Sequence, residues 1–346
     1  MKKTRMVILC LLSLLLAACG SAAEAPQTTA ALTAETTQPP QLHTPVLCPW
    51  EYDVCAGAVS DGRLHYYFLS AEGQKTDENG NILPGGGEIA KWGDCCLIVF
   101  PDGQTMLIDC GLATVGPILT ENLRRMQITR LDHIVITHPH SDHQGGIFHP
   151  KNLTGEGVLD QFDIGTVYHR GGSDPSREDA CYVENACKER DLPLQVLEMG
   201  DALQIGAVTA RVLWPKEGTW EKEITGTANV NNSSIVIRFD YAEHSSLFTG
   251  DLYDDGEFAL MSAHSMDMMD VDLLKAPHHA QYTSGSEVFL SLVSPEITVA
   301  TGFEPITDET RIRYEKSGTL LLSDIARGFI HVSTDGKDMT WEASRP

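Results

Sequence analysis

Basic side chains are scarce in this chain. Its 346 residues contain 25 Lys and Arg against 48 Asp and Glu, so the formal net charge at pH 7 is −23. A charge of this sign repels polyanions over long range, which argues against tight nonspecific binding of nucleic acid. It leaves room for a local basic cleft. The candidates are Arg170, Arg238, Lys275 and Arg311, and we expect each of them to be a solvated surface residue.

Apolar runs long enough to cross a membrane are also missing. The run at residues 6–16 is shorter than the ~20 residues that span a bilayer core of ~30 Å. Three basic residues precede it, and Leu-Ala-Ala-Cys at positions 16–19 has the form of a lipoprotein cleavage site. We therefore expect residues 1–18 to be a lipoprotein signal peptide and Cys19 to be lipidated. An ordinary signal peptide cut nearby is the alternative.

The segment that follows has little apolar bulk. Residues 19–45 are rich in Thr, Ala, Gln and Pro after the lipidated Cys19, and such a segment cannot bury a core. We expect it to be a flexible tether. Residues 46–346, without an internal linker or a short-period repeat, then form the folded domain. In this interpretation the protein is exported and lipid-anchored to the outer face of the cytoplasmic membrane.

Cys-x-x-Cys pairs are absent from the sequence, so we place no sulfur at a metal. Outside the membrane disulfides are chemically allowed, and two pairs are close enough in sequence to form them: Cys48 with Cys55, and Cys181 with Cys187. The remaining cysteines lie in apolar strand patterns, which favours buried and inert thiols: Cys95, Cys96 and Cys110.

Three histidines and an aspartate are concentrated in the run His138–His143, with the sequence HPHSDH. An apolar strand leads into the run, and two glycines follow shortly after it. Imidazole and carboxylate ligands suit zinc and related divalent metals. Residues two apart in an extended loop project to the same side, so His138 and His140 can bind one ion. Asp142 and His143 lie where the loop turns into a helix and can bind a second ion.

Three other apolar segments end in polar residues that can serve the same site. Asp109 follows the segment 106–108, Asp251 follows 246–249, and His278 and His279 follow a third apolar run. A single aspartate at a strand end is more often a turn or cap residue. The ordered series together with the histidine cluster favours a functional site.

The alternation of β-rich and helical stretches predicts a layered α/β domain. The expected strands are near 64–69, 95–100, 104–109, 132–137, 164–168, 208–213, 234–239, 245–249, 271–275 and 297–301. The expected helices are near 114–127, 178–190, 255–262, 286–293 and 319–326.

The order of Asp109, the His-x-His-x-Asp-His run, Thr-Gly-Asp251 and Pro-His-His279 resembles the metallo-β-lactamase superfamily. Within it, the chain is most similar to the extracellular hydrolase domain of ComEC-type competence proteins. Trp92-Gly93-Asp94 and the strand after it resemble that family's first hairpin, and the segment 231–237 resembles its central strand. The resemblance covers roughly residues 60 to 340 and implies an αββα four-layer sandwich with metal-dependent hydrolase activity.

The resemblance also implies a role for each residue of the site. One ion would be bound by His138 and His140, the other by Asp142, His143 and His279, with Asp251 bridging both. Asp109 would orient a histidine without binding an ion. The expected cofactors are two divalent metal ions, zinc first and manganese as the alternative. The candidate catalytic residues are Asp142 and His278, and His278 either donates to the leaving group or packs below the site.

Two departures from the family pattern concern the substrate side. No histidine precedes the central strand, where Asn231 and Asn232 stand instead, and these amides are candidate contacts of the first ion or of the substrate. Ala280-Gln281 follows the two histidines, where the family pattern continues with Gly-Ser. We therefore expect the first ion to be held less tightly and the substrate preference to have changed.

These features predict a cell-surface hydrolase that uses a metal-bound hydroxide on a small-molecule or polymeric phosphoester, as a phosphodiesterase or nuclease. One alternative is a lipid-anchored binding protein with a vestigial metal site. Another is a cell-wall choline-phosphate esterase, which the acidic surface disfavours less than DNA. The family flanks and the missing histidine argue against β-lactam hydrolysis.

Overall fold

The computed structural model describes residues 60–69, 73–74, 88–89, 93–113, 116–147, 157–171, 182–218, 226–302 and 306–345. The expected signal peptide, the tether and Cys19 lie outside these residues, as do Cys48, Cys55 and Cys181. Within them, no helix combines the length and the apolar character needed to cross a membrane.

The first sheet has eight strands in the order β17-β16-β1-β4-β5-β6-β7-β8. Its strands β5 to β8 are parallel, whereas β17, β16, β1, β4 and β5 pair antiparallel along the order. The bounds are β1 Leu64–Phe68, β4 Cys96–Val99, β5 Thr105–Ile108, β6 Arg130–Ile136, β7 Asp163–His169, β8 Leu194–Val196, β16 Ile330–Thr334 and β17 Met339–Ala343. A separate small ribbon pairs β2 Gly73–Gln74 with β3 Glu88–Ile89.

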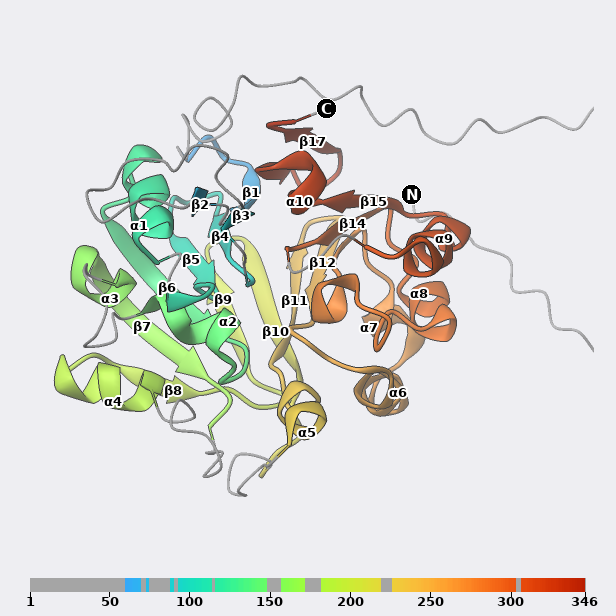
Figure 1. The fold of residues 1–346 in the computed structure, drawn as a ribbon, viewed down its shortest axis with the longest axis horizontal. Coiled ribbons are helices and arrows are strands. Elements are labelled where there is room, and N and C mark those ends of the chain that lie inside the picture. The colour runs from blue at the N-terminus through green and yellow to red at the C-terminus, as the bar shows by residue number, and fades with distance from the viewer. Residues whose placement is uncertain are drawn as a thin grey trace, which may run out of the picture. The chain divides into compact units, whose positions relative to one another are not determined.

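The second sheet has seven strands in the order β15-β14-β13-β12-β11-β10-β9. Strands β9 to β12 are antiparallel, and strands β12 to β15 are parallel. The bounds are β9 Ala202–Ile205, β10 Val208–Trp214, β11 Val236–Tyr241, β12 His244–Phe248, β13 Leu273–Lys275, β14 Ile297–Ala300 and β15 Leu320–Ser323. Figure 1 shows the two sheets side by side with helices on their outer faces.

The helices follow the strands that they cover (Figure 1). On the first half of the chain they are α1 Gly116–Arg125, α2 Ser141–Gln144, the 3-10 turn η2 Gly145–Ile147, α3 Val158–Gln161 and α4 Tyr182–Glu189. On the second half they are α5 Thr227–Asn231, α6 Asp254–Ala263, α7 Met266–Met269, the 3-10 turn η4 Pro277–Ala280, α8 Glu287–Val293, α9 Asp308–Ser317 and α10 Asp324–Arg327.

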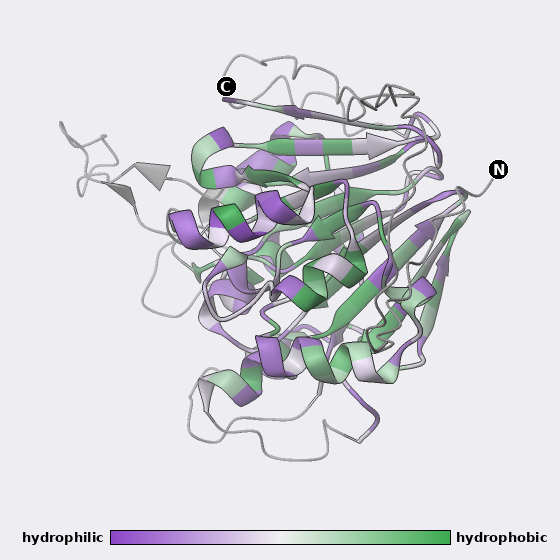
Figure 2. Cartoon of the chain, turned by 90° about the vertical axis from the view of Figure 1, so that its right-hand side faces the viewer, coloured by the Kyte–Doolittle hydropathy of each residue, from purple (hydrophilic) through white to green (hydrophobic). Residues whose placement is uncertain are grey.

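Both faces of the inner strands are buried, because successive side chains of a strand point to opposite faces. In β4, Cys96 and Ile98 belong to the core between the two sheets, whereas Leu97 and Val99 belong to the core beneath α1 and α3. A third core separates the second sheet from α6, α8 and α9. In Figure 2 the strands are largely hydrophobic and the helices carry both colours. These three cores confirm the expected αββα layering.

One expected helix is wrong. Residues 319–326 form strand β15 and then the single turn α10. Leu320, Leu321 and Leu322 make a short apolar run, and a run of this length does not distinguish a buried parallel strand from a helix by periodicity. Helix α9 and strands β8, β9, β16 and β17 were not predicted.

Candidate metal centre

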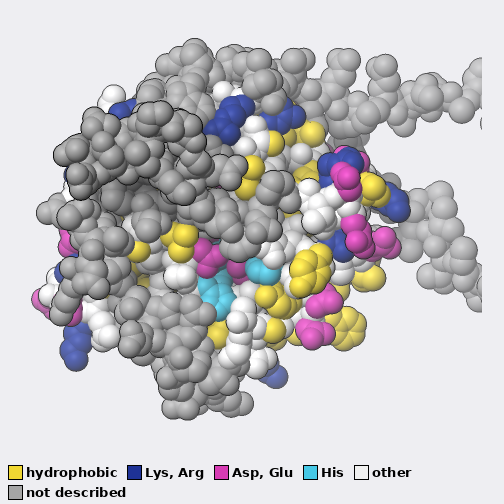
Figure 3. Space-filling model, in the orientation of Figure 1, with side chains coloured by type: hydrophobic (Ala, Val, Ile, Leu, Met, Phe, Trp, Pro, Cys, Tyr) yellow, Lys and Arg dark blue, Asp and Glu magenta, His cyan; other side chains and the backbone are white. Residues whose placement is uncertain are grey.

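Parallel strands bring the predicted residues to one edge of the two sheets. Asp109 follows β5 and His138 follows β6 in the first sheet, whereas Asp251 follows β12 and His279 follows β13 in the second. The carboxyl ends of parallel strands lie at the same edge, so four strand ends that are distant in sequence meet there. Figure 3 shows histidine and acidic side chains gathered together on this face of the molecule.

The backbone is unusual at the residues that build the site. Asp109, His278 and His279 have positive φ angles of 58°, 44° and 56°. Residues other than glycine seldom adopt this region, and it costs on the order of 1–3 kcal/mol for each residue. Gly93, with φ +106°, lies so close to α2 that an added Cβ would be 1.7 Å from the Asp142 carbonyl oxygen. Backbone strain and close packing of this kind are concentrated at functional sites.

Four side chains form the tightest donor group. Ligand atoms of Asp142, His143, Asp251 and His279 all lie within 4.8 Å of one another. Asp251 Oδ2 is 3.1 Å from His143 Nε2 and 3.2 Å from His279 Nε2. His279 Nε2 is 3.6 Å from Asp142 Oδ2. Two ligands of a tetrahedral ion with bonds of ~2.0–2.1 Å are ~3.3–3.4 Å apart, so these separations fit a divalent metal.

His138 and His140 form a looser group beside the first. His138 Nε2 is 2.9 Å from His140 Nδ1 and 3.9 Å from Asp251 Oδ2. Among the described residues, these two histidines do not join a third donor in a group as compact as the one around Asp251. The two predicted ion sites are therefore unequal in the number of side chains that the structure brings together.

Asp109 lies behind the tight group. Its Oδ2 accepts hydrogen bonds from His143 Nδ1 and from the Thr137 hydroxyl, each at 2.8 Å, and its Oδ1 accepts the Thr137 N–H at 2.8 Å. The carboxylate is fully buried. This is the position that the predicted role of orienting a histidine requires.

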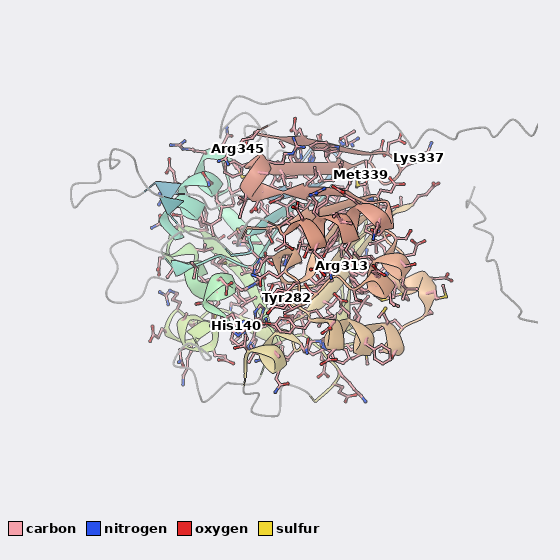
Figure 4. All side chains as sticks on the ribbon, turned by 45° about the vertical axis from the view of Figure 1, so that its right-hand side comes forward. His140, Tyr282, Arg313, Lys337, Met339 and Arg345 are labelled. Atoms are coloured by element: carbon pink, nitrogen blue, oxygen red, sulfur yellow. The ribbon has the colours of Figure 1, made fainter. Side chains whose placement is uncertain are left out.

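His278 lies beside Asp251, next to the tight donor group. Its Nε2 is 4.0 Å from Asp251 Oδ2, and its Nδ1 is 2.5 Å from the Thr283 hydroxyl. Its ring is 4.6 Å from that of Tyr253. Tyr282 lies in the same loop as His278 and is 76% exposed. Figure 4 labels Tyr282 and His140. His278 thus lies beside the donor group.

The two asparagines have different surroundings. Asn231 is 1% exposed, its side chain hydrogen-bonds the Tyr253 hydroxyl, and its Oδ1 has no partner among the described residues. Asn232 Oδ1 accepts the Tyr253 N–H at 2.9 Å, and its carbonyl accepts the Trp214 indole N–H at 2.7 Å. Asn232 therefore fixes the entry to α6, and of the two only Asn231 keeps a free acceptor for an ion or a substrate.

Two residues of the site were not predicted, Asp94 and Lys275. Asp94 precedes β4, is 4% exposed and has its Oδ1 3.1 Å from His279 Nδ1. Lys275 ends β13, is 3% exposed and forms an ion pair with Asp94 Oδ2. One feature of the sequence could have indicated Lys275. It is a single lysine inside an apolar run, just before the two histidines, and such a run is typical of a buried strand.

The expectation of four solvated basic residues is largely wrong. Lys275, Arg170 and Arg238 are 3%, 2% and 9% exposed. Arg238 donates to the carbonyls of Met268 and Asp270, which is a structural role, and Arg170 lines a small pocket that His138 also lines. Only Arg311 is on the surface, where it pairs with acidic residues of its own helix. The one cation that contacts the donor carboxylates is Lys275, among the residues that the structure describes.

The buried carboxylates and imidazoles of the tight donor group shift one another's pKa values, and the shifts favour positive charge at this place. Burial lowers the pKa of His143 and of His279, but the Asp251 carboxylate outweighs it and raises both pKa values well above the usual range. Burial raises the pKa of Asp251, but the two imidazoles lower it well below the usual range. The imidazoles that would bind a divalent ion hold protons when no ion is bound, so metal binding here competes with proton binding.

The cysteines that the structure describes do not belong to the donor group. Cys95, Cys96 and Cys110 are buried and free, and burial raises the pKa of each thiol well above its usual value. This confirms the expectation of inert thiols. Cys187 is also free, and Cys181, with which its spacing allowed a pairing, lies outside the described residues.

Comparisons with known proteins agree with this geometry. Residues 93–159 match the model of the metallo-beta-lactamase superfamily. ComE operon protein 3 of Bacillus subtilis (strain 168) is 28% identical over 174 residues, which cover 50% of this chain and 20% of that protein. Competence protein ComA of Neisseria gonorrhoeae is 28% identical over 205 residues, covering 59% of this chain and 25% of that protein.

The matches thus span between a fifth and a quarter of the length of these relatives. Among solved structures, the metallo-beta-lactamase fold protein YhfI from Bacillus subtilis is 14% identical, with a TM-score of 0.42 over 75% of this chain and 96% of that chain. The predicted resemblance to the metallo-beta-lactamase superfamily is confirmed by the family model over residues 93–159 and by the competence proteins, and the described residues include a donor group that could hold a metal ion.

Proposed function

We propose that the protein hydrolyses phosphoesters, as a phosphodiesterase or nuclease that depends on zinc or manganese. The observation that carries this proposal is the position of Asp251. One oxygen of this carboxylate faces His143 and His279 at 3.1 and 3.2 Å, and it lies 3.9 Å from His138, which belongs to the second group of donors. A carboxylate shared in this way suits two adjacent ions, and such pairs serve phosphoester hydrolysis.

Divalent ions, when bound, supply Lewis acidity and lower the pKa of a water toward neutrality. The chain's own residues prepare the rest. Asp109 holds the His143 ring through its Nδ1 at 2.8 Å, so that Nε2 faces the donor group. His278 lies beside Asp251, where its imidazole could donate to a substrate oxygen or to the leaving group. The buried amide oxygen of Asn231 could bind an ion or accept a hydrogen bond from a substrate hydroxyl.

The substrate is proposed from charge and from the relatives. Competence-type cleavage of DNA is the analogy, and the net charge of −23 opposes tight nonspecific binding of a polyanion. A cell-wall choline-phosphate ester is a rival phosphoester that this charge opposes less. The vestigial-site alternative is motivated by Asn231, which stands where a third histidine would serve the first ion.

A hydrolysis panel tests the proposal. The protein without residues 1–18, reconstituted with Zn²⁺ or Mn²⁺, is offered bis(p-nitrophenyl) phosphate, single- and double-stranded DNA, a choline-phosphate ester and a β-lactam. We expect metal-dependent turnover of at least one phosphoester and none of the β-lactam. The variants His140→Ala and Asp142→Ala should abolish turnover with little loss of fold, because loop ligands add little to core burial.

Asp267→Asn is the matched control, because this exposed carboxylate on α7 lies outside the donor group and should leave turnover unchanged. Metal-loaded protein that turns over none of the phosphoesters would favour the vestigial binding site. Wild-type turnover in both His140→Ala and Asp142→Ala would place the active site elsewhere.

We propose in addition that Cys19 carries a diacylglyceryl group that anchors the protein to the outer face of the cytoplasmic membrane. Two acyl chains are needed for stable anchoring, since one binds only marginally. Cys19→Ala should move the protein from the membrane fraction to the soluble fraction. Retention of that variant on membranes would contradict the anchor.

A further inference from the structure

Two imidazoles of the tight donor group each have a second, buried carboxylate on the side of the ring that faces away from Asp251. His143 Nε2 and His279 Nε2 face the same oxygen of Asp251, at 3.1 and 3.2 Å. On the opposite side of each ring, Nδ1 faces a buried carboxylate: Asp109 Oδ2 at 2.8 Å for His143, and Asp94 Oδ1 at 3.1 Å for His279. His279 therefore has a carboxylate on each side of its ring, as His143 does. The His143–Asp109 contact is a hydrogen bond, and the His279–Asp94 contact is an ion pair that links the two sheets.

A carboxylate accepts hydrogen bonds but cannot donate one when ionised. An imidazole nitrogen that faces it therefore carries the proton, which leaves the lone pair on the other nitrogen. For His279 this places the lone pair on Nε2, toward Asp251 and Asp142. That tautomer is the one able to bind an ion, and the carboxylate also raises the basicity of the ring.

Asp94 is kept ionised and fixed by its other contacts. The Lys275 ammonium pairs with Asp94 Oδ2, and the Thr301 hydroxyl donates to Asp94 Oδ1. Lys275 also donates to the Gly250 carbonyl at 3.0 Å and lies 3.7 Å from Asp251 Oδ1. A buried carboxylate without such a partner would gain a proton, so the lysine is what allows Asp94 to remain an acceptor.

The lysine has a second consequence. Asp94, Asp109 and His143 have ligand atoms within 4.8 Å of one another and form a second group able to hold a metal ion. An ion there would withdraw His143 from the group around Asp251. The Lys275 ammonium supplies the positive charge that Asp94 requires, and its buried stem leaves it little freedom to move away.

We propose that Asp94 is a positioning residue that sets the tautomer of His279, and that Lys275 is the built-in cation that holds Asp94 in this role. The proposal rests on the metal centre of the proposed function but not on hydrolysis. It concerns how tightly and in which group an ion is bound.

The test uses metal binding as its readout. Apoprotein is titrated with Co²⁺, whose absorption spectrum reports affinity and ligand geometry. Asp94→Asn should weaken the tighter Co²⁺ site by roughly 10–100-fold, as loss of a supporting carboxylate does elsewhere. The matched control is Asp272→Asn. Asp272 accepts the Ser245 N–H in the second sheet at 2.8 Å and, within the described residues, makes no hydrogen bond or ion pair with the donors, so its variant should keep the wild-type affinity.

A second readout separates positioning from a merely structural effect. In Zn²⁺-loaded protein with ¹⁵N-labelled histidine, His279 should carry its proton on Nδ1, and Asp94→Asn should lose or broaden that signal while the His143 signal remains. The pair Asp94→Asn/Lys275→Met removes both charges together and serves if the single variant does not fold. It should fold and show the same weakened site.

The outcomes are distinguishable. A folded Asp94→Asn variant with Co²⁺ affinity within twofold of wild type and an unchanged His279 tautomer would overturn this proposal alone. A wild-type protein that binds no Co²⁺ would overturn the metal centre and, with it, both proposals.

Discussion

Asn231 shows how a single residue can set the balance between the two ion sites. Its amide oxygen is buried and has no partner in the described part of the chain. The family resemblance implies a histidine in this region, before the central strand, that would give the first ion a third imidazole. The shared Asp251 carboxylate lies 3.9 Å from His138 Nε2. We expect two ions of unequal affinity, the weaker one at His138 and His140.

Restoring a histidine at this position should reduce the inequality. Asn231→His adds a nitrogen ligand, so the weaker Zn²⁺ site should tighten on the order of 10-fold or more in a calorimetric titration. Asn232→His is the control. Its native amide binds the Tyr253 N–H, so this variant should lose about 1 kcal/mol of stability without tightening either site. Two equally tight sites in the native protein would contradict this account.

Some residues of the site are close together in sequence, and others meet only in the fold. His138, His140, Asp142 and His143 lie within six residues, so their common role follows from local spacing. Asp94 and Lys275 are 181 positions apart and meet only because β4 and β13 belong to facing sheets. Asp94 has no local pattern that distinguishes it from a turn aspartate, and the one local indication for Lys275 is the apolar run in which it lies. Burial, which reverses the interpretation of Lys275, is a property of the fold.

At the scale of elements, the loop before β4 is locked against α2. Gly93 has φ +106°, and a Cβ there would lie 1.7 Å from the Asp142 carbonyl oxygen. Gly200 has the same φ of +106° with no atom within 4 Å of such a Cβ. The pair therefore separates the strain of the backbone conformation from the collision with α2.

We expect Gly200→Ala to lower the free energy of unfolding by roughly 1 kcal/mol and Gly93→Ala to lower it by roughly 2–4 kcal/mol. Gly93→Ala should also weaken metal binding, because α2 carries Asp142 and His143. Urea denaturation of the two variants beside wild type measures the difference. Equal losses in both would show that the contact with α2 has no energetic weight.

Elements with a strong pattern were predictable, and those without one were not. The ten expected strands all occur, because each is an apolar run bounded by turn residues. The helix expected at residues 319–326 is wrong because Leu320–Ser323 is a short apolar run that pairs with its parallel neighbour β14, and the sequence does not show this pairing. Strand β16 pairs with β1 from more than 260 positions away, and β17 pairs with β16 to complete the edge of the first sheet.

At the scale of the whole molecule, acid should weaken the fold through His244 as well as through the carboxylates. This residue begins β12, is 3% exposed, and burial lowers its pKa to about 4 from the ordinary 6.5, although Asp272 raises it in part. Since the folded-state pKa is depressed, the stability from neutral His244 is fully present above pH 6.5. It is lost as the pH falls through about 4.

His244→Gln removes this dependence while keeping a polar side chain of similar size. Between pH 7 and pH 4.5, the free energy of unfolding of wild type should fall more than that of the variant, by an amount on the order of 2 kcal/mol. Urea midpoints at the two pH values measure it. Parallel losses in both proteins would show that His244 is not held neutral by burial.

The central claim is that strands of two sheets assemble a centre for divalent metal around Asp251. Elemental analysis of purified protein without residues 1–18, after reconstitution with Zn²⁺ or Mn²⁺ and dialysis, tests it most directly. The account predicts about one to two metal ions per chain, fewer at acid pH, and almost none in Asp251→Asn. Wild-type protein that retains no metal after reconstitution would contradict it.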